Sequence, residues 1–129
     1  MPFIAKSAPI AAQVGDTVSI QETPMYGGKE INNGDQVFLW ASETQGGQGL
    51  WARGEVLGTE TGTRKLGITV RIEEMVTTGH FGLQQIIPYR DSTENTPIVG
   101  LARKLHRHAH NKIAQLTDSE AELLNRHFV

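Results

Sequence analysis

The 129 residues include 38% hydrophobic residues, 14 glycines and no cysteine, and their formal net charge is −2. This length suits one domain, residues 1–129, with one hydrophobic core. The lack of cysteine excludes disulfides and zinc–thiolate sites and is typical of a reducing compartment, so we expect a cytoplasmic protein. The N-terminal residues do not resemble a secretory signal, and no run approaches the roughly 20 apolar residues that span a bilayer.

Short strands are expected in the first part of the chain. Residues 3–6 and 17–21 are candidate strands, and residues 36–42 are apolar on both faces, which predicts a central strand. In residues 50–57 and 64–73, apolar and polar side chains alternate with a period of two, which predicts strands with one buried face. A further apolar run follows at residues 81–89.

Helices are expected in the last third. Residues 98–105 carry apolar side chains at helical spacing, with Pro97 near the first turn, where proline is tolerated. Thr117 and Glu120 fit a capping box, which predicts a last helix after Thr117. Strands first and helices last favour an α+β fold in which helices pack on a curved or barrel-like sheet.

The most biased segment is residues 103–112, which contains three histidines, no acid and four other cationic residues: Arg103, Lys104, Arg107 and Lys112. As a helix, it would present a basic face that contacts the phosphates of a nucleic acid; the alternative is a solvated helix face that favours the macrodipole. Because the net charge is negative, binding to nucleic acid must depend on such a local patch. His106 and His110 are four residues apart, but the zincin glutamate is replaced by Arg107, so we expect no metal site and no cofactor.

Trp40 and Trp51 lie on predicted strands that flank the glycine-rich loop 45–49. The loop lacks the Lys-Ser/Thr pair of a P-loop and is interpreted as a hairpin connection. An aromatic side chain on a strand packs in the core or forms a stacking wall for a flat ligand such as a base. Both interpretations stay open for the two tryptophans.

No catalytic residue is assigned, because the sequence contains no nucleophile elbow and no specific Ser/His/Asp arrangement. Four polar residues of the predicted strands could converge at the mouth of a barrel, where a desolvated lysine beside a glutamate serves as a general base. The alternative is a set of ordinary surface ion pairs. The four residues are Lys6, Ser7, Glu55 and Glu73.

Three ordered segments resemble EVE domains. Residues 3–9 (FIAKSAP) resemble their opening strand, which commonly reads Tyr-Trp-Leu-x-Lys-Ser-Glu-Pro, with Ala8 in place of the glutamate. Residues 34–42 (GDQVFLWAS) resemble their Gly-Asp-x-Val-x-x-Tyr-His-Ser strand, with Ala41 in place of the histidine. Residues 52–56 (ARGEV) are similar to the next strand, and the late Ile-Ile-Pro and the closing helix also fit.

EVE domains belong to the PUA-like superfamily, together with ASCH and YTH domains. The resemblance implies a pseudo-β-barrel of about five or six strands with flanking helices. It also implies a nucleic-acid-binding module, for DNA or RNA, that receives a flipped modified base in a pocket beside the barrel. The implied base-binding residues are Lys6, Ser7, Trp40, Ser42 and Trp51, and the basic segment would contact the backbone through Arg103, Lys104, Arg107 and Lys112.

Two other functions remain open. Some ASCH-type relatives are small amidohydrolases that act on modified nucleosides, and the resemblance would then give Lys6, Ser7 and Glu55 the catalytic roles. A plain protein-interaction domain is the third hypothesis, and two fully shielded tryptophans would favour it.

Overall fold

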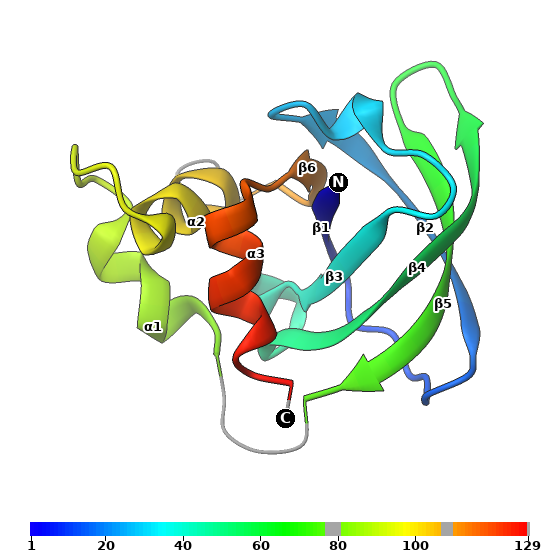
Figure 1. Cartoon of the computed structure of the whole chain (residues 1–129), viewed down its shortest axis with the longest axis horizontal. Helices are drawn as coiled ribbons and strands as arrows, with labels where there is room; N and C mark the ends of the chain where they lie inside the picture. The colour runs from blue at the N-terminus through cyan, green and yellow to red at the C-terminus, as the bar shows by residue number, and fades with distance from the viewer. Residues whose placement is uncertain (77–80, 107–109, 129) are drawn as a thin grey trace.

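The computed structural model describes residues 1–76, 81–106 and 110–128, and their strands close into a mixed barrel (Figure 1). Around the barrel the order is β1-β3-β4-β5-β2-β6, in which β1 pairs with β3 and β2 pairs with β6 in parallel and the other neighbours are antiparallel. The bounds are β1 (Pro2–Ser7), β2 (Thr17–Met25), β3 (Gln36–Ala41), β4 (Gly49–Thr61), β5 (Leu66–Met75) and β6 (Lys112–Gln115). The expected α+β pseudo-barrel is confirmed.

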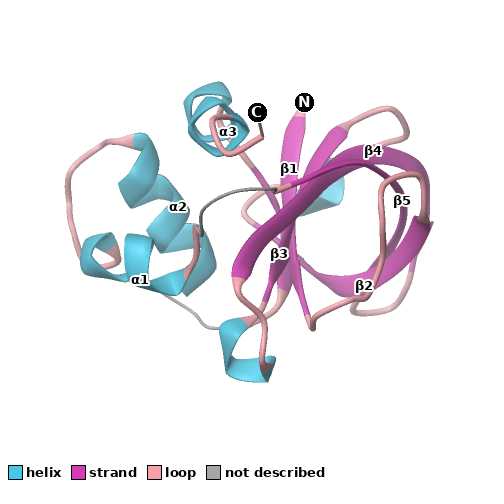
Figure 2. Cartoon of the chain, turned by 90° about the horizontal axis from the view of Figure 1, so that it is seen from below, coloured by secondary structure: helices cyan, strands magenta, loops and turns pink. Residues whose placement is uncertain are grey.

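Three α-helices gather on one side of the barrel, as Figure 2 shows. They are α1 (Leu83–Ile86), α2 (Pro97–His106) and α3 (Asp118–Asn125), and the single-turn 3₁₀ helices are η1 (Gly28–Glu30), η2 (Glu43–Gln45) and η3 (Ile87–Tyr89). Among the described residues, no helix is long and apolar enough to cross a membrane.

The buried side chains form two clusters separated by the wall of the barrel. Along β3, Val37 and Leu39 point into the barrel, whereas Phe38 and Trp40 point outward against the helices. Because successive side chains of a strand face opposite sides, this double burial explains why residues 36–42 are apolar throughout. The interpretation of that segment as a central strand is therefore confirmed.

The other patterned segments also behave as predicted. On β5, the apolar side chains that alternate along residues 66–72 are buried in the barrel, and on β4 Ala52 and Val56 are buried there too. The register shift at Trp51 turns Leu50 to the outer cluster, so the one-face pattern of β4 begins at Ala52. Helix α2 starts at Pro97, and α3 starts after a capping box. In that box, Thr117 Oγ1 accepts from the Glu120 amide at 3.1 Å and Glu120 Oε1 accepts from the Thr117 amide at 2.9 Å.

The prediction that residues 103–112 form one helix is wrong. Helix α2 ends at His106, and Lys112 begins β6, which pairs with β1 on one side and with β2 on the other. Strand β6 buries Ile113 inside the barrel and Ala114 outside it, so it contributes a side chain to each of the two buried clusters. A strand of four residues is too short to be recognised from the period of its side chains. The strand forms here because β1 and β2 would otherwise have unpaired edges.

The apolar run at residues 81–89 forms short helices rather than a strand. Ile86 and Phe81 from this segment are buried in the cluster between the barrel and the helices. Immediately before α1, the Phe81 carbonyl accepts from the Leu50 amide at 2.9 Å, which attaches the helical side of the molecule to the start of β4.

Two glycines of β4 give a matched test of barrel packing. A methyl group on Gly54 would lie 2.0 Å from the Arg71 carbonyl oxygen on β5, whereas a methyl group on Gly58 would meet no atom within 4 Å. Because backbone cannot give way cheaply, we expect Gly54→Ala to lower the free energy of unfolding by about 1–3 kcal/mol or more. Gly58→Ala is expected to change it by less than about 0.5 kcal/mol. Urea unfolding of both variants checks this, and equal effects would contradict the tight β4–β5 approach.

Candidate nucleic-acid interface

The residues predicted to bind a base lie together at one end of the barrel, on or directly after three neighbouring strands. In the parallel β1–β3 pair, Lys6 lies beside Trp40, and Ser7 lies beside Ala41. We call this group the barrel-end residues: Lys6, Ser7, Trp40, Ser42 and Trp51. Their side chains meet different surroundings, although the strands bring their backbones together.

Lys6 is buried and binds the end of a helix. Its side chain points outward from β1, only 2% of the residue is exposed, and Nζ donates to the Leu105 carbonyl at 2.8 Å. The last carbonyls of a helix have no partner within the helix and carry its negative partial charge. The Lys6 ammonium therefore caps α2 and at the same time places a positive charge inside the interface between the barrel and the helices.

Lys112 also caps the end of α2, from β6, where it lies opposite Lys6 in the β1–β6 pair. It is fully buried, and its Nζ donates to the Lys104 carbonyl at 2.7 Å. The predicted contact of Lys112 with a nucleic-acid backbone is therefore not made in this conformation, because its ammonium lies under α2. A charge that was expected on the surface of a helix instead holds that helix to the barrel.

Trp40 is in the core. It is 0% exposed, its ring lies edge-on to Phe81 and His106 with centroid distances of 6.0 Å and 5.9 Å, and its Nε1 donates to Glu43 Oε1 at 3.0 Å. The second oxygen of Glu43 accepts from the Leu83 amide at the start of α1. Stacking of a base on Trp40 stays a prediction, and it requires that Phe81 or His106 move.

Trp51 is the more accessible tryptophan. It lies on β4 where the register with β3 shifts, is half-buried, and packs beside Met75 at the end of the barrel cluster. Its Nε1 is buried and has no hydrogen-bond partner in the described part of the chain. Buried donors are nearly always paired in proteins, so an acceptor at this position would be favourable.

The two serines lie at the end of the parallel β1–β3 pair. The Ser42 amide donates to the Ser7 carbonyl at 2.8 Å, which extends the β1–β3 pairing by one step. Ser7 Oγ donates to the Ala8 carbonyl at 3.0 Å, and Ser42 Oγ lies 3.0 Å from Thr44 Oγ1 in η2. Both hydroxyls retain the capacity to accept a further hydrogen bond.

Positive charge dominates the buried surroundings of His106. Burial lowers the pKa of Lys6, against the opposing influence of the Glu43 carboxylate, and burial with the charge of Lys6 lowers the pKa of Lys112 to about 8. Burial, followed by the charges of Lys6, Lys112 and Arg90, lowers the pKa of His106 to about 4. His106 Nε2 has no hydrogen-bond partner among the described residues. The helix–barrel interface thus contains a neutral imidazole beside two ammonium groups.

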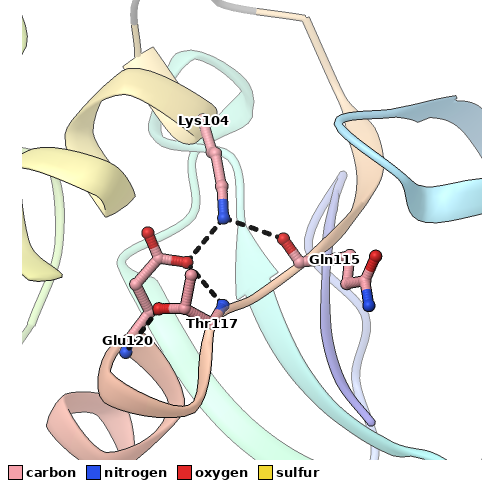
Figure 3. Close-up of polar contacts among 4 residues, drawn as sticks. All are labelled: Lys104, Gln115, Thr117 and Glu120. Carbon is pink, nitrogen blue, oxygen red and sulfur yellow. Dashed lines mark hydrogen bonds and ion pairs between the residues drawn. The ribbon is translucent and has the colours of Figure 1, made fainter.

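The other predicted backbone contacts of the basic segment, Arg103, Lys104 and Arg107, have different surroundings. Lys104 Nζ donates to the Gln115 carbonyl at 2.9 Å and to Glu120 Oε1 at 2.6 Å, as Figure 3 shows, so its charge is already paired. Arg103 is partly exposed and makes no hydrogen bond or ion pair with the described residues. Arg107 lies outside the described residues. Arg103 is therefore the predicted backbone contact that is placed to meet a phosphate.

The catalytic grouping of Lys6, Ser7 and Glu55 is wrong. On β3, Lys6 is paired with Trp40 and Glu55 is paired with Gln36. Trp40 and Gln36 are four residues apart, so Lys6 and Glu55 are separated by about 13 Å along the strands. Glu55 instead accepts from Arg71 Nη2 at 2.8 Å on the exposed side of the sheet. Glu73 is exposed on β5 and also pairs with Arg71, so the mouth of the barrel does not gather these carboxylates.

No group of three or more His, Cys, Asp or Glu side chains among the described residues could hold a metal ion. His106 and His110 do not share a helix face, since α2 ends at His106.

Comparisons with known proteins bear on the fold. No protein-family model matches the sequence, and no curated protein matches it significantly. The DUF55 domain of human thymocyte nuclear protein 1 superposes with a TM-score of 0.67 over 96% of both chains at 11% identity. That protein is an EVE-domain protein, so this chain has an EVE-type fold.

Two further structures share this EVE-type fold. Human thymocyte nuclear protein 1 in complex with 5-methylcytosine-containing DNA has a TM-score of 0.66 and 11% identity, over 98% of this chain and 96% of that one. A protein from Pseudomonas syringae has a TM-score of 0.61 and 13% identity, over 98% and 99% of the two chains. The fold predicted from three short motifs is thus confirmed over nearly the whole chain.

Sequence reasoning missed the residues that enclose Trp40. Glu43 follows Trp40 by three positions across the turn of η2, and this short spacing was the one local signal for their hydrogen bond. Phe81 and His106 reach Trp40 only through the tertiary fold.

The low pKa of His106 predicts a pH dependence of stability. Because the imidazole has an ordinary pKa of 6.5 when unfolded and about 4 when folded, the unfolded chain takes up the proton first on acidification. The free energy of unfolding should therefore fall as the pH falls from about 6.5 to about 4. Denaturant unfolding should show a shallower fall over this window for His106→Gln, while the exposed control His110→Gln should keep the slope of the wild type. Identical slopes for all three proteins would contradict the neutral, buried imidazole.

Proposed function

We propose that this protein is a nucleic-acid-binding module that recognises a modified base at the barrel-end residues. One observation carries the proposal: the EVE-type fold is shared, over 98% of this chain, with a protein solved in complex with 5-methylcytosine-containing DNA. Because the identity is 11%, the role of each side chain must be argued from this chain alone.

The barrel end supplies the types of groups that base recognition uses. Trp51 offers a half-buried aromatic face and an unpaired Nε1 donor, and a base presents both a π-face and acceptor atoms. Ser7 and Ser42 lie close by as further hydrogen-bonding groups. Lys6 binds the Leu105 carbonyl with one of its three donors, and because it is buried, a base edge could use the other two only if the end of α2 moved. Trp51 is therefore the preferred stacking residue, ahead of the enclosed Trp40.

Electrostatics favour a polyanionic partner at this end. Lys6, Lys112 and Arg90 surround His106 closely enough to depress its pKa, and Glu43 is the carboxylate that acts on Lys6. A phosphate placed nearby would relieve the repulsion among these cations and release counterions from the nucleic acid. The negative net charge of the chain then confines binding to this local region.

The absence of cysteine from the sequence supports a reducing compartment, and we place the protein in the cytoplasm on that ground.

A binding panel tests the proposed function. We expect oligonucleotides with 5-methylcytosine to bind more tightly than matched unmodified oligonucleotides, in single- or double-stranded form. Affinity should fall as salt rises, because phosphate contacts release counterions. Fluorescence anisotropy at two salt concentrations measures both effects. Equal, salt-independent binding of all oligonucleotides, or no binding, would contradict the proposal.

Substitution of Trp51 tests the assignment of the stacking residue. Trp51→Ala should weaken binding of the modified oligonucleotide by about 5- to 100-fold, the cost of one stacked base. Trp51→Phe should retain part of the affinity, because it keeps an aromatic face and loses the Nε1 donor. Leu57→Ala is the control, since Leu57 is exposed on the same strand and lies six residues from Trp51, about 20 Å at the rise of a strand. A folded Trp51→Ala variant with wild-type affinity would remove Trp51 from the site.

A further inference from the structure

A polar groove lies apart from the barrel-end residues, between α2 and the start of α3. Its volume is about 440 Å³, within the range of small-molecule sites, which is roughly 300–1,000 Å³. Its lining includes Tyr26, Gly100, Arg103, Lys104, Ser119 and Glu120. None of the barrel-end residues contributes to it.

The groove holds a carboxylate oxygen with unused bonding capacity. Glu120 is only 4% exposed, and its Oε1 accepts from Lys104 Nζ and from the Thr117 amide. In Figure 3 both dashed lines to the Glu120 carboxylate reach this one oxygen, and the other oxygen has none. Oε2 has no hydrogen-bond partner among the described residues. Since a carboxylate has about four lone-pair sites, Oε2 can accept from a ligand.

Glycine at position 100 of α2 lets the Glu120 carboxylate lie directly against the helix. A methyl group on Gly100 would lie 2.0 Å from Glu120 Oε2, so a side chain at this position would displace the carboxylate. Arg103, on the next turn of the same wall, carries a guanidinium that makes no ion pair with the described residues. Within the described ranges, this side of the groove therefore offers one carboxylate oxygen and one guanidinium without a partner.

Tyr26 completes the lining with an aromatic ring. It is 38% exposed, and its backbone has the left-handed φ of 50°, which non-glycine residues rarely adopt. Such strain persists where the surroundings hold a residue in place, and it is concentrated at ligand sites. The ring provides a face for stacking.

We propose that this groove binds a nucleotide whose base carries an exocyclic amino group. Glu120 Oε2 accepts from the amino group, as carboxylates do from cytosine N4, Arg103 binds the phosphate, and Tyr26 stacks on the base. The choice of a nucleotide rests on the proposed function, whereas the requirement for an amino group rests on Oε2 alone. The groove thus gives the protein a second contact for a nucleotide outside the barrel-end residues.

Two nucleotides that differ at the base edge test the proposal on the wild-type chain. We expect 2′-deoxycytidine 5′-monophosphate to shift the NMR signals of the Thr96, Gly100 and Ser119 amides. It should bind about 5-fold or more tightly than 2′-deoxyuridine 5′-monophosphate, which has a carbonyl in place of the amino group. Unmoved groove amides, equal affinities, or the same shifts with inorganic phosphate alone would each overturn the proposal.

An isosteric variant sharpens the test. In Glu120→Gln, the amide oxygen can still accept from Lys104 and Thr117, and the amide nitrogen then replaces the unpaired acceptor with a donor. We expect the preference to reverse toward the deoxyuridine nucleotide. Glu122→Gln is the control, because Glu122 is exposed on α3 and pairs only at the surface with Arg126. An unchanged preference in folded Glu120→Gln would overturn the assignment of Oε2.

A second variant covers the case in which Glu120→Gln does not fold. Arg103→Gln should weaken both nucleotides by about 10-fold and leave their ratio unchanged, because both carry the same phosphate. Wild-type affinity in Arg103→Gln would overturn the groove site.

The two proposals fail in different ways. If 5-methylcytosine oligonucleotides bind and move only amides near the barrel-end residues, the groove site is wrong and the proposed function stands. If no oligonucleotide binds while the deoxycytidine nucleotide moves the groove amides, the proposed function is wrong and the groove site stands.

Discussion

Closure of the barrel by β6 is the constraint on which the rest of the structure depends. This four-residue strand pairs with β1 on one side and β2 on the other, so it removes two sheet edges at once. It also carries Lys112 to a position opposite Lys6, and the two ammonium groups then reach consecutive carbonyls at the end of α2. Without β6, the barrel would be open and α2 would lose one of its two caps.

These caps make the helix–barrel interface unusual in its charge. Two lysines, a neutral imidazole and one carboxylate lie among apolar side chains, where each unpaired charge is costly. The C-terminal carbonyls of α2 offset part of that cost, because charge-assisted hydrogen bonds are stronger than neutral ones. The same arrangement favours an anionic partner, so the stability of the fold and the proposed attraction of a nucleic acid depend on the same residues.

The two candidate sites use this framework differently. At the barrel-end residues, Trp51 lies where β4 departs from regular pairing, and its Nε1 has no hydrogen-bond partner among the described residues. In the groove, the Lys104–Glu120 pair fixes one carboxylate oxygen, and the other, beside Gly100, has no hydrogen-bond partner within residues 1–76, 81–106 and 110–128. In each case a rigid element holds a polar atom that no other residue in the described part of the chain satisfies, which is the physical basis of both proposals.

The sequence by itself determined the elements whose information is local. The period-two patterns of residues 50–57 and 64–73, the capping box at Thr117 and the proline start of α2 reflect interactions within a few residues, and they predicted two strands and two helices correctly. Three short motifs also sufficed to predict the EVE-type fold. Only the tertiary structure decided that residues 112–115 pair as a strand, that Trp40 is enclosed by Phe81 and His106, and that Lys6 and Lys112 cap a helix. Those outcomes depend on partners up to 99 residues away in the chain, which no local period or propensity encodes.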